Sequence, residues 1–300
     1  MVDPFPAPAP PLIEIRRLTR RFGPTTALDD LSLSVPRGGV FGLIGGNGAG
    51  KTTLIKHVLG TLKAQSGEVR VFGLNPVDNP VGVLGRVGYL SEERDLPDWM
   101  QVGELIWYTR AFFANWDDAY AEQLREAFDL DPRAKVKHLS RGQRARAGLL
   151  IALAHRPDLL VLDEPSSGLD PVVRRDILGA IIRTIADEGR TVLFSSHLLD
   201  EVERVADRVA MIHQGRILLA SSIEELKATH RRVTLRFADP IDRPPALVGS
   251  TSCAGGAREW TYICNGQGPQ ILRAAEAIGG DVVDDAAMSL DEIFVSRVLT

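Results

Sequence analysis

The chain has 300 residues, which is enough for one large domain with an appendage or for two small domains. With 44% hydrophobic and 25% charged residues and a formal net charge of −4, it gives no electrostatic reason to expect nucleic acid as a partner. The chain has only two cysteines, Cys253 and Cys264, so no disulfide framework is indicated and a reducing cytoplasm is expected. No apolar run reaches the roughly 18 residues that a membrane span needs.

The N-terminal segments predict a tail followed by strands and a helix. Residues 1–11 are rich in proline and predict an extended, mobile tail rather than a secretory signal. Residues 12–22 and 28–35 alternate like half-exposed strands, and the apolar run at 39–45 predicts a buried strand that ends in glycines. A helix is expected after it, because the apolar residues from Leu54 onward recur at helical spacing.

A phosphate-binding loop lies between that buried strand and that helix. Residues 45–52 read GGNGAGKT and fit the pattern G-x-x-x-x-G-K-[ST]. The glycines let the backbone curl so that its N–H groups point inward, and the helix adds the partial positive charge of its N-terminus. Lys51 is expected to reach the β- and γ-phosphates of a nucleotide, and Thr52 to ligate Mg²⁺.

Two later buried strands also end in polar residues. Residues 159–164, LLVLDE, place Asp163 and Glu164 at the carboxyl end of a strand, where ligands bind in open α/β sheets. Asp163 is suited to hold Mg²⁺, and Glu164 to polarise an attacking water as a general base. The strand at 191–197 ends in His197, which is placed to bond a γ-phosphate or to hold the water. Three such strand ends predict one site for phosphate chemistry.

The remaining segments predict a helical insert and a C-terminal appendage. Residues about 95–150 have helical spacing, and 208–220 read as a hairpin with Gly215 at its turn. From 225 to 300 the pattern is weaker, with two alternating strands, a helix and a short strand, which is typical of a small α+β domain.

At this point the motifs, in their order, resemble those of the ATP-binding subunit of ABC transporters. GGNGAGKTT is similar to the Walker A motif, LSRGQ at 139–143 to the signature, LLVLDEP to Walker B and SGLD at 167–170 to the D-loop. The resemblance covers roughly residues 12–220 and implies an α/β P-loop NTPase of ABC type, whose ATPase domain is expected at 12–224. Its expected parts are a β-rich N-terminal subdomain, a RecA-like core, an inserted helical subdomain at about 95–150 and the small α+β appendage.

The resemblance also implies how the residues act. Two subunits are expected head to tail with two ATP molecules between them, each held by Walker A of one subunit and the signature of the other. The residues expected to bind ATP are Phe22, Gly45, Gly46, Asn47, Gly48, Ala49, Gly50, Lys51, Thr52 and Thr53. The signature residues acting in trans are Leu139, Ser140, Arg141, Gly142 and Gln143. Asp170 is implied as a cross-dimer contact, Thr52 and Asp163 as ligands of Mg²⁺, and Glu164, His197 and Glu92 as catalytic residues.

Three positions leave alternatives open. Phe22 either stacks on adenine or belongs to the core of its strand. Glu92 stands where the family has a glutamine, and the neighbouring Glu93 is an alternative for the same role. Arg141 replaces the usual glycine at the third signature position, where it either reaches a phosphate or an acid across the dimer or points to water.

Within the family, the chain resembles ATPases of two-component bacterial exporters, whose permease is a separate polypeptide. This resemblance predicts two partners: a second copy of the chain (or a related ATPase subunit) and an integral membrane permease. It also predicts that the chain lies at the cytoplasmic face of the membrane. An importer ATPase and a non-transport switch acting on DNA or ribosomes are the alternatives. Six aromatic residues cluster in the helical insert: Trp99, Trp107, Tyr108, Phe112, Phe113 and Trp116. Either most of them form the core of the insert, or some of them line a groove for a permease helix. In the second case Trp99 or Met100 is expected to lie on that groove.

Overall fold

The computed structural model describes residues 10–93, 95–186 and 189–299, so most of the predicted tail at 1–11 lies outside the described residues. The chain divides into two compact units. The first unit comprises Met1–Leu198 and Ala210–Ala220, and the second unit comprises Leu199–Val209 and Ser221–Thr300. The sequence pattern placed a boundary near residue 224, and the structure groups the segment Leu199–Val209 with the C-terminal residues as well.

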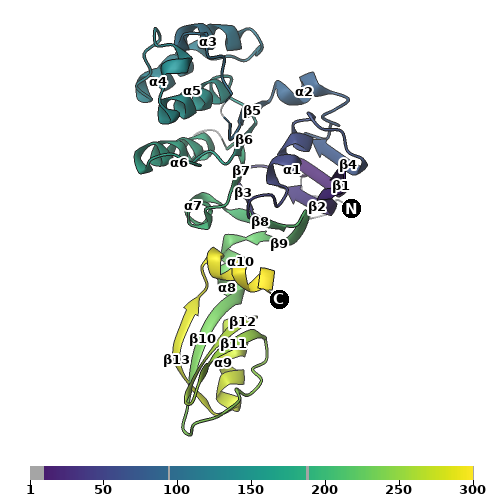
Figure 1. Cartoon of the computed structure of the whole chain (residues 1–300), viewed down its shortest axis with the longest axis vertical. Coiled ribbons are helices and arrows are strands. Elements are labelled where there is room, and N and C mark those ends of the chain that lie inside the picture. Colours follow the sequence, from purple (N-terminus) through teal and green to yellow (C-terminus); the bar gives the residue numbers. More distant parts are fainter. Residues whose placement is uncertain (1–9, 94, 187–188, 300) are drawn as a thin grey trace, which may run out of the picture. The chain divides into compact units, whose positions relative to one another are not determined.

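The first unit is built around a six-stranded sheet (Figure 1). Its strands follow the order β5-β6-β7-β3-β8-β9, and β5, β6, β7 and β3 are parallel neighbours. This order places the carboxyl ends of β6, β7 and β3 next to one another, which is where the three polar strand ends of the sequence meet. The bounds are β3 Gly39–Ile44, β5 Val87–Leu90, β6 Leu159–Asp163, β7 Thr191–Ser196, β8 Arg208–His213 and β9 Arg216–Ser222.

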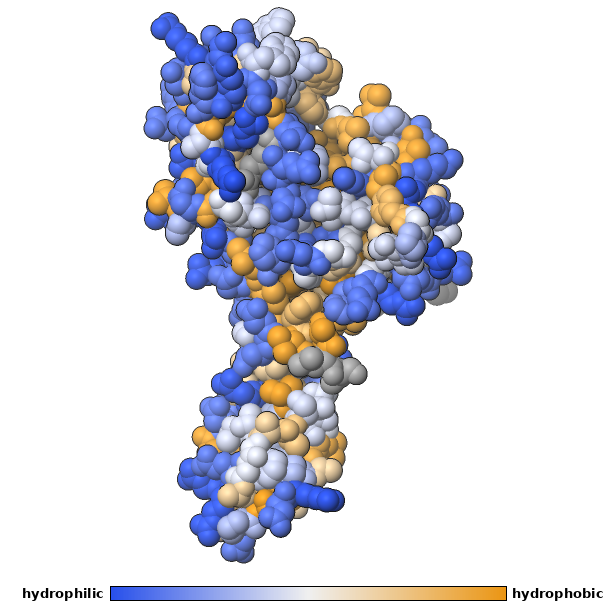
Figure 2. Space-filling view, in the orientation of Figure 1, coloured by the Kyte–Doolittle hydropathy of each residue, from blue (hydrophilic) through white to orange (hydrophobic). Residues whose placement is uncertain are grey.

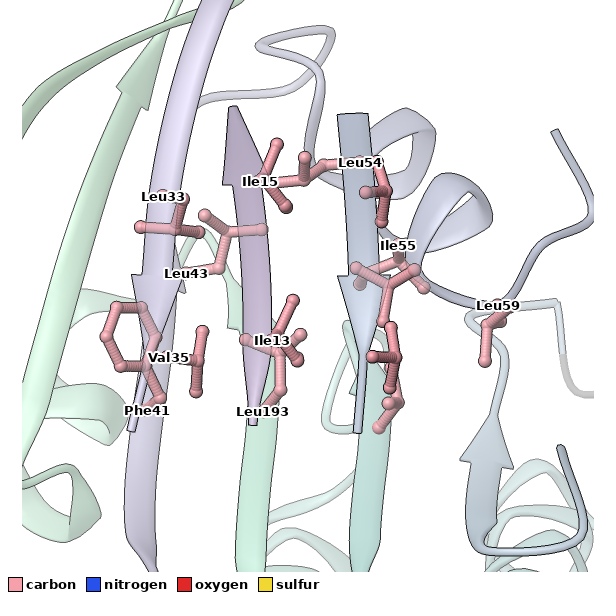
Figure 3. Packing of buried hydrophobic residues seen from close by; sticks show 14 of the residues in the cluster. Ile13, Ile15, Leu33, Val35, Phe41, Leu43, Leu54, Ile55, Leu59 and Leu193 are labelled. Carbon is pink, nitrogen blue, oxygen red and sulfur yellow. The ribbon is translucent and has the colours of Figure 1, made fainter. Parts of the chain in front are cut away.

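An antiparallel sheet of order β2-β1-β4 forms the β-rich part of the first unit. It consists of β1 Ile13–Phe22, β2 Thr25–Val35 and β4 Ser66–Val71. Apolar side chains of β1 and β2 share one core with side chains of α1 (Lys51–Val58), β3 and β7, as Figure 3 shows for Ile13, Leu33 and Leu54. Because both sheets pack on α1, the helix that follows the phosphate loop is held from two sides.

Helices make up the insert predicted at about 95–150. They are α3 Val102–Arg110, α4 Asp118–Ala127, the 3₁₀ turn Val136–His138 and α5 Arg141–Leu153. Also in the first unit are α2 Pro80–Leu84 and α6 Pro171–Ala186. Within the described residues, no helix is long and apolar enough to cross a membrane.

Most of the aromatic residues singled out in the insert lie at its surface, contrary to one interpretation of the sequence, whereas Phe113 and Trp116 are half-buried and Phe113 stacks on the buried His155. The exposed fraction is 71% for Trp99 and 73% for Trp107, and Tyr108 and Phe112 are exposed as well. The small core contains Met100 instead, which is 4% exposed and packs with Leu105 and Val136. Met100 therefore does not lie on a surface groove, and Trp99 does lie at the surface.

The second unit contains a four-stranded antiparallel sheet of order β11-β12-β10-β13. Its strands are β10 His230–Phe237, β11 Ser250–Gly256, β12 Glu259–Asn265 and β13 Gly280–Ala287. Its helices are α7 Leu199–Val205, α8 Ile223–Thr229, α9 Gly268–Ala277 and α10 Leu290–Leu299. This α+β content is the kind predicted for 225–300.

Candidate functional site

The phosphate loop requires glycine at two positions for steric reasons. Gly50, immediately before α1, has φ +113°, and a Cβ atom there would lie 2.6 Å from the carbonyl oxygen of Ala27. A Cβ atom on Gly45 would lie 2.4 Å from the carbonyl oxygen of Ile212. Side chains at these positions would push the loop off both strands, so the curled backbone depends on glycine.

The loop forms one wall of a cavity of about 300 Å³. Three further residues, Thr25, Thr26 and Ala27 at the start of β2, were not singled out from the sequence, where they carry no motif. Glu92 and Glu164 complete the lining from other parts of the unit. The residues from the loop and α1 are Asn47, Gly48, Ala49, Gly50, Lys51, Thr52 and Thr53. The first turn of α1 holds no acidic residue, so its positive end favours an anion in this cavity.

Lys51 is held by the loop and by Glu164. Its Nζ donates hydrogen bonds to the carbonyl oxygens of Gly45 at 2.6 Å and Gly46 at 3.2 Å. Nζ also lies 3.0 Å from Oε1 of Glu164, and each of these two side chains is only 6% exposed. A buried ammonium and a buried carboxylate each need a compensating partner, and here each supplies it to the other.

Glu164 is fixed by contacts to the neighbouring strand β7. Its backbone N–H donates to Oγ of Ser195 at 3.0 Å, and that hydroxyl donates to Oδ1 of Asp163 at 2.6 Å. The Oε2 atom lies 2.7 Å from Nδ1 of His197. Glu164 has φ +47°, a left-handed conformation that costs energy for a residue with a side chain. The strained turn aims the carboxylate back at Lys51 and His197, so Lys51, Glu164 and His197 are brought together as predicted.

Glu92 and Glu93 occupy different cavities. Glu92 lines the cavity with Lys51 and Glu164. Glu93 lines a separate cavity of about 440 Å³ with Lys56 and Tyr89. Burial raises the pKa of Tyr89 to about 12, with further contributions from nearby carboxylates that include Asp163 and Glu93. The structure therefore separates the two alternatives that the sequence left open, and Glu92 is the one at the phosphate loop.

Phe22 lies at the end of β1 and is 45% exposed, so its interpretation as a core residue is wrong. The guanidinium carbon of Arg20 lies 4.6 Å from the centroid of its ring. The ring does not line the 300 Å³ cavity, whose lining on this side comes from Thr25 to Ala27. Stacking of Phe22 on adenine stays a prediction.

The LSRGQ segment begins α5. Oγ of Ser140 accepts a hydrogen bond from the backbone N–H of Gln143 at 3.2 Å, and the Gln143 side chain accepts one from the Ser140 N–H at 3.0 Å. This capping box satisfies two N–H groups at the helix start. Gly142 is required because a Cβ there would lie 2.6 Å from Cγ2 of Val173 in α6.

The D-loop lies beside this helix start. Oδ1 of Asp170 accepts hydrogen bonds from the backbone N–H groups of Val172 at 2.9 Å and Val173 at 3.1 Å, so it caps α6 of its own chain. The exposed Arg141 places its Nη1 atom 3.6 Å from the point where a Cβ on Gly168 would lie. Arg141 therefore extends along the D-loop of its own chain. No residue of 139–143 lines the 300 Å³ cavity within the described part of the chain.

The chain is similar in sequence to ATP-binding proteins of ABC transporters. Residues 28–167 match the family model described as ABC transporter. The chain is 32% identical over 225 residues to the bacitracin transport ATP-binding protein BcrA of Enterococcus faecalis, covering 74% of this chain and 73% of that protein. It is 35% identical over 241 residues to the daunorubicin resistance ATP-binding protein DrrA3 of Streptomyces coeruleorubidus, covering 77% and 76% respectively.

Solved structures share the fold. The structure of an ATP-binding subunit of an ABC transporter superposes with a TM-score of 0.66 at 27% identity, over 72% of this chain and 92% of that one. A cassette bound to ADP and Pi superposes with a TM-score of 0.63 at 18% identity, over 70% and 98%, which supports the fold alone. The predicted α/β P-loop fold of ABC type is confirmed. The chain therefore belongs to the ABC transporter family as one of its ATP-binding proteins, and it is an ATPase.

Proposed function

We propose that the chain hydrolyses ATP in a head-to-tail dimer and thereby powers export through a separate membrane permease. The observation that carries this proposal is the division of the chemistry within one chain. Lys51 and Glu164 line one cavity and His197 contacts Glu164, whereas Ser140 of the signature segment contributes nothing to that cavity. A second copy facing the first would supply its Ser140 to the ATP held here.

The residues at the cavity fit a nucleotide with Mg²⁺. The glycine-rich loop and the start of α1, which holds no acidic residue, suit a polyphosphate. The polyphosphate would replace Glu164 as the ion partner of Lys51. Thr52 and Glu92 line the cavity and offer oxygen donors, the ligand type that Mg²⁺ prefers, and the buried Asp163 lies next to the lining residue Glu164 at the end of β6. Among the described residues, no group of three or more His, Cys, Asp or Glu side chains could hold a metal ion. The phosphate oxygens of the nucleotide would therefore supply the remaining ligands of Mg²⁺. Bound Mg²⁺ would neutralise charge on the phosphates.

Glu164 would then act as the general base. After Lys51 moves to the phosphates, the Glu164 carboxylate would still contact His197. The strained backbone at Glu164 would still point this carboxylate into the cavity. A carboxylate there can accept a proton from an attacking water. His197 would hold the carboxylate and, through its other ring nitrogen, sense the γ-phosphate. Ser140 and the N–H groups at the start of α5 would face that phosphate from the partner copy.

The permease is proposed to dock on the first unit at the cavity whose lining residue Leu96 lies three positions before the exposed Trp99. The cavity of about 440 Å³ that contains Glu93 is also lined by Leu96, Asp95, Ile151 and Lys56, so apolar side chains are accompanied there by two acidic side chains and one basic side chain. A cytoplasmic helix with apolar and basic residues would complement this surface. Binding there would hold the chain at the cytoplasmic face of the membrane. The bacitracin and daunorubicin names of the relatives support export as the direction.

Cysteine cross-linking tests the head-to-tail dimer. One batch carries Asn47→Cys and another carries Ser140→Cys, both with Glu164→Gln to slow turnover and with the exposed Cys253 replaced by serine. Mixed with ATP and oxidised, the two are expected to give a covalent dimer, because Asn47 and Ser140 are both exposed and would face each other across the seam. Glu126→Cys on α4 is the matched control and should not cross-link to Asn47→Cys.

Two results would overturn the proposal. One is a dimer that forms equally with the α4 control, and the other is the absence of any Asn47–Ser140 product under conditions where ATP is bound. Export is tested separately in proteoliposomes that contain the chain and a permease that co-purifies with it. Stimulation of ATP hydrolysis by the permease, with outward movement of cargo, is the expected result, and inward movement would contradict it.

A further inference from the structure

The two faces of the sheet in the second unit are covered differently. One face packs against α9 through Val233, Leu235, Tyr262 and Ile271, which belong to one buried cluster. On the opposite face, Arg232, Ile263 and Ser252 are cross-strand neighbours on β10, β12 and β11. There α10 is tied to the sheet by an ion pair of 2.6 Å between Arg232 and Glu292.

A cavity of about 450 Å³ remains between α10 and this second face. Apolar side chains dominate it, with Ile263 from β12, Met288 before α10 and Val295 on α10, and Val295 is 53% exposed. Figure 2 shows apolar side chains on the surface around α10. The volume and the apolar lining are those of a small-molecule pocket, and methionine adapts to ligands of different shape.

Two carboxylates belong to the same cavity, and only one of them is neutralised. Glu292 is paired with Arg232 and accepts hydrogen bonds from the N–H and hydroxyl groups of Ser289. Asp291 makes no ion pair or side-chain hydrogen bond within the described part of the chain. Partial burial raises the pKa of Asp291, and the carboxylates of Asp200, Glu203 and Glu292 raise it further.

The nearby acids leave a negative charge in excess. Glu203 is neutralised by Lys227 at 2.8 Å and bonded by the N–H of Leu290 at 3.1 Å. Neither Asp200 nor Asp291 forms an ion pair with a basic side chain among the described residues. Asp291 is exposed, so it can meet a ligand from solvent; its charge would repel an anion from this cavity and attract a cation.

We propose that this cavity binds a small organic cation with an apolar body, whose charge lies beside Asp291 and whose apolar part contacts Ile263, Met288 and Val295. Every lining residue comes from the second unit, and none belongs to the nucleotide cavity. The site is thus separate from ATP hydrolysis, and it gives the C-terminal unit a ligand of its own.

Isosteric ions of opposite charge test this assignment with the full chain. Tetraphenylphosphonium and tetraphenylborate have the same shape, and calorimetry compares their binding in the presence of saturating ATP. The cation is expected to bind at least about tenfold more tightly than the anion. Asp291→Asn should weaken cation binding by about tenfold, whereas Asp281→Asn, an exposed acid of β13 outside the cavity, should leave it unchanged.

The place of binding is read from methionine methyl signals. The chain has four methionines, and the cation should shift the signal of Met288 but not those of Met100 and Met211, which are buried in the first unit. Equal binding of both ions, equal effects of the two Asp variants, or shifts only at Met100 or Met211 would each overturn the proposal. So would a dimer that forms without ATP and is lost in Val295→Asp, because the cavity would then be covered by a second copy.

Discussion

The Nζ atom of Lys51 lies 3.0 Å from Oε1 of Glu164, and both side chains are almost wholly buried. The cation of the phosphate loop and the carboxylate at the end of β6 thus neutralise each other in the nucleotide-free chain. On the second carboxylate oxygen, His197 lies 2.7 Å away. The carboxylate of Glu164 therefore connects the lysine of the phosphate loop with His197, the residue that follows β7.

Glu164→Gln should abolish turnover and leave ATP binding intact. An amide cannot accept the proton of the attacking water, and loss of a general base lowers kcat by about 10²–10⁴. Steady-state ATPase assays and nucleotide-binding titrations measure the two effects. Glu93→Gln, a change of the same kind in the adjacent cavity, is the control and should retain ATP hydrolysis. Normal hydrolysis by Glu164→Gln would refute the general-base assignment.

The buried pair predicts a coupling in stability. Lys51→Met leaves the carboxylate of Glu164 buried without its cation, so the free energy of unfolding should fall by about 3 kcal/mol. In the double variant Lys51→Met/Glu164→Gln the uncompensated charge is gone, and a coupling of about 1–3 kcal/mol should appear. Urea denaturation without nucleotide measures all four forms. Additive losses would show that the two side chains do not interact in solution. Lys51→Met should also lose ATP binding.

Glu92 and Glu93 should differ in their effect on Mg²⁺. Since only Glu92 lines the nucleotide cavity, Glu92→Gln should shift the Mg²⁺ concentration that gives half-maximal ATPase activity. Glu93→Gln should leave that concentration unchanged, because Glu93 lines the neighbouring cavity. A Mg²⁺ titration of the two variants beside wild type decides the point, and equal shifts would contradict it.

Variants of Ser140 can separate its capping role in α5 from its proposed role at the phosphate of the partner copy. Ser140→Ala removes the cap of α5 and should cost about 1 kcal/mol of stability. Ser140→Asp retains an N-cap acceptor, so stability should be kept, while its negative charge would repel the phosphate of the partner site and lower kcat. Thermal unfolding and ATPase assays are read together. Full activity in Ser140→Asp would argue against a phosphate contact.

His155 should make the chain less stable in mild acid. Burial lowers its pKa to about 4, its Nε2 lies 3.2 Å from the carbonyl oxygen of Val87, and its ring stacks on Phe113. Between pH 6.5 and 4 the unfolded chain binds more protons than the folded chain, so stability falls as the pH falls and levels off near pH 4.

The size of this effect is about 2 kcal/mol between pH 7.5 and pH 5. Urea denaturation at the two pH values measures it in wild type and in His155→Gln, which cannot titrate. The other buried histidines, His57 and His230, are present in both proteins and cancel in the comparison. An equal loss in the two proteins would show that His155 does not contribute.

Much of the nucleotide site can be predicted from local sequence. The GGNGAGKT run, the acids after LLVL and His197 after its strand all depend on short segments, because loop geometry and strand ends are local properties. The positions of Thr25 to Ala27 and of Met100 were not predictable, since they carry no motif and their exposure depends on what packs on them. For the same reason, helical spacing alone did not distinguish the buried Met100 from the exposed Trp107.

The sequence by itself determined the family, the phosphate loop and the set of residues proposed to carry the chemistry. Only the tertiary structure decided which of these residues meet. The strand order β6-β7-β3 brings Asp163, Glu164 and His197 to the same edge of the sheet as the loop, and the backbone after β5 places Glu92 and Glu93 in different cavities. Strand order depends on long-range pairing, which short periodic patterns do not encode. The cavity beneath α10 arises in the same way, from a helix and a sheet face whose contact no local pattern specifies.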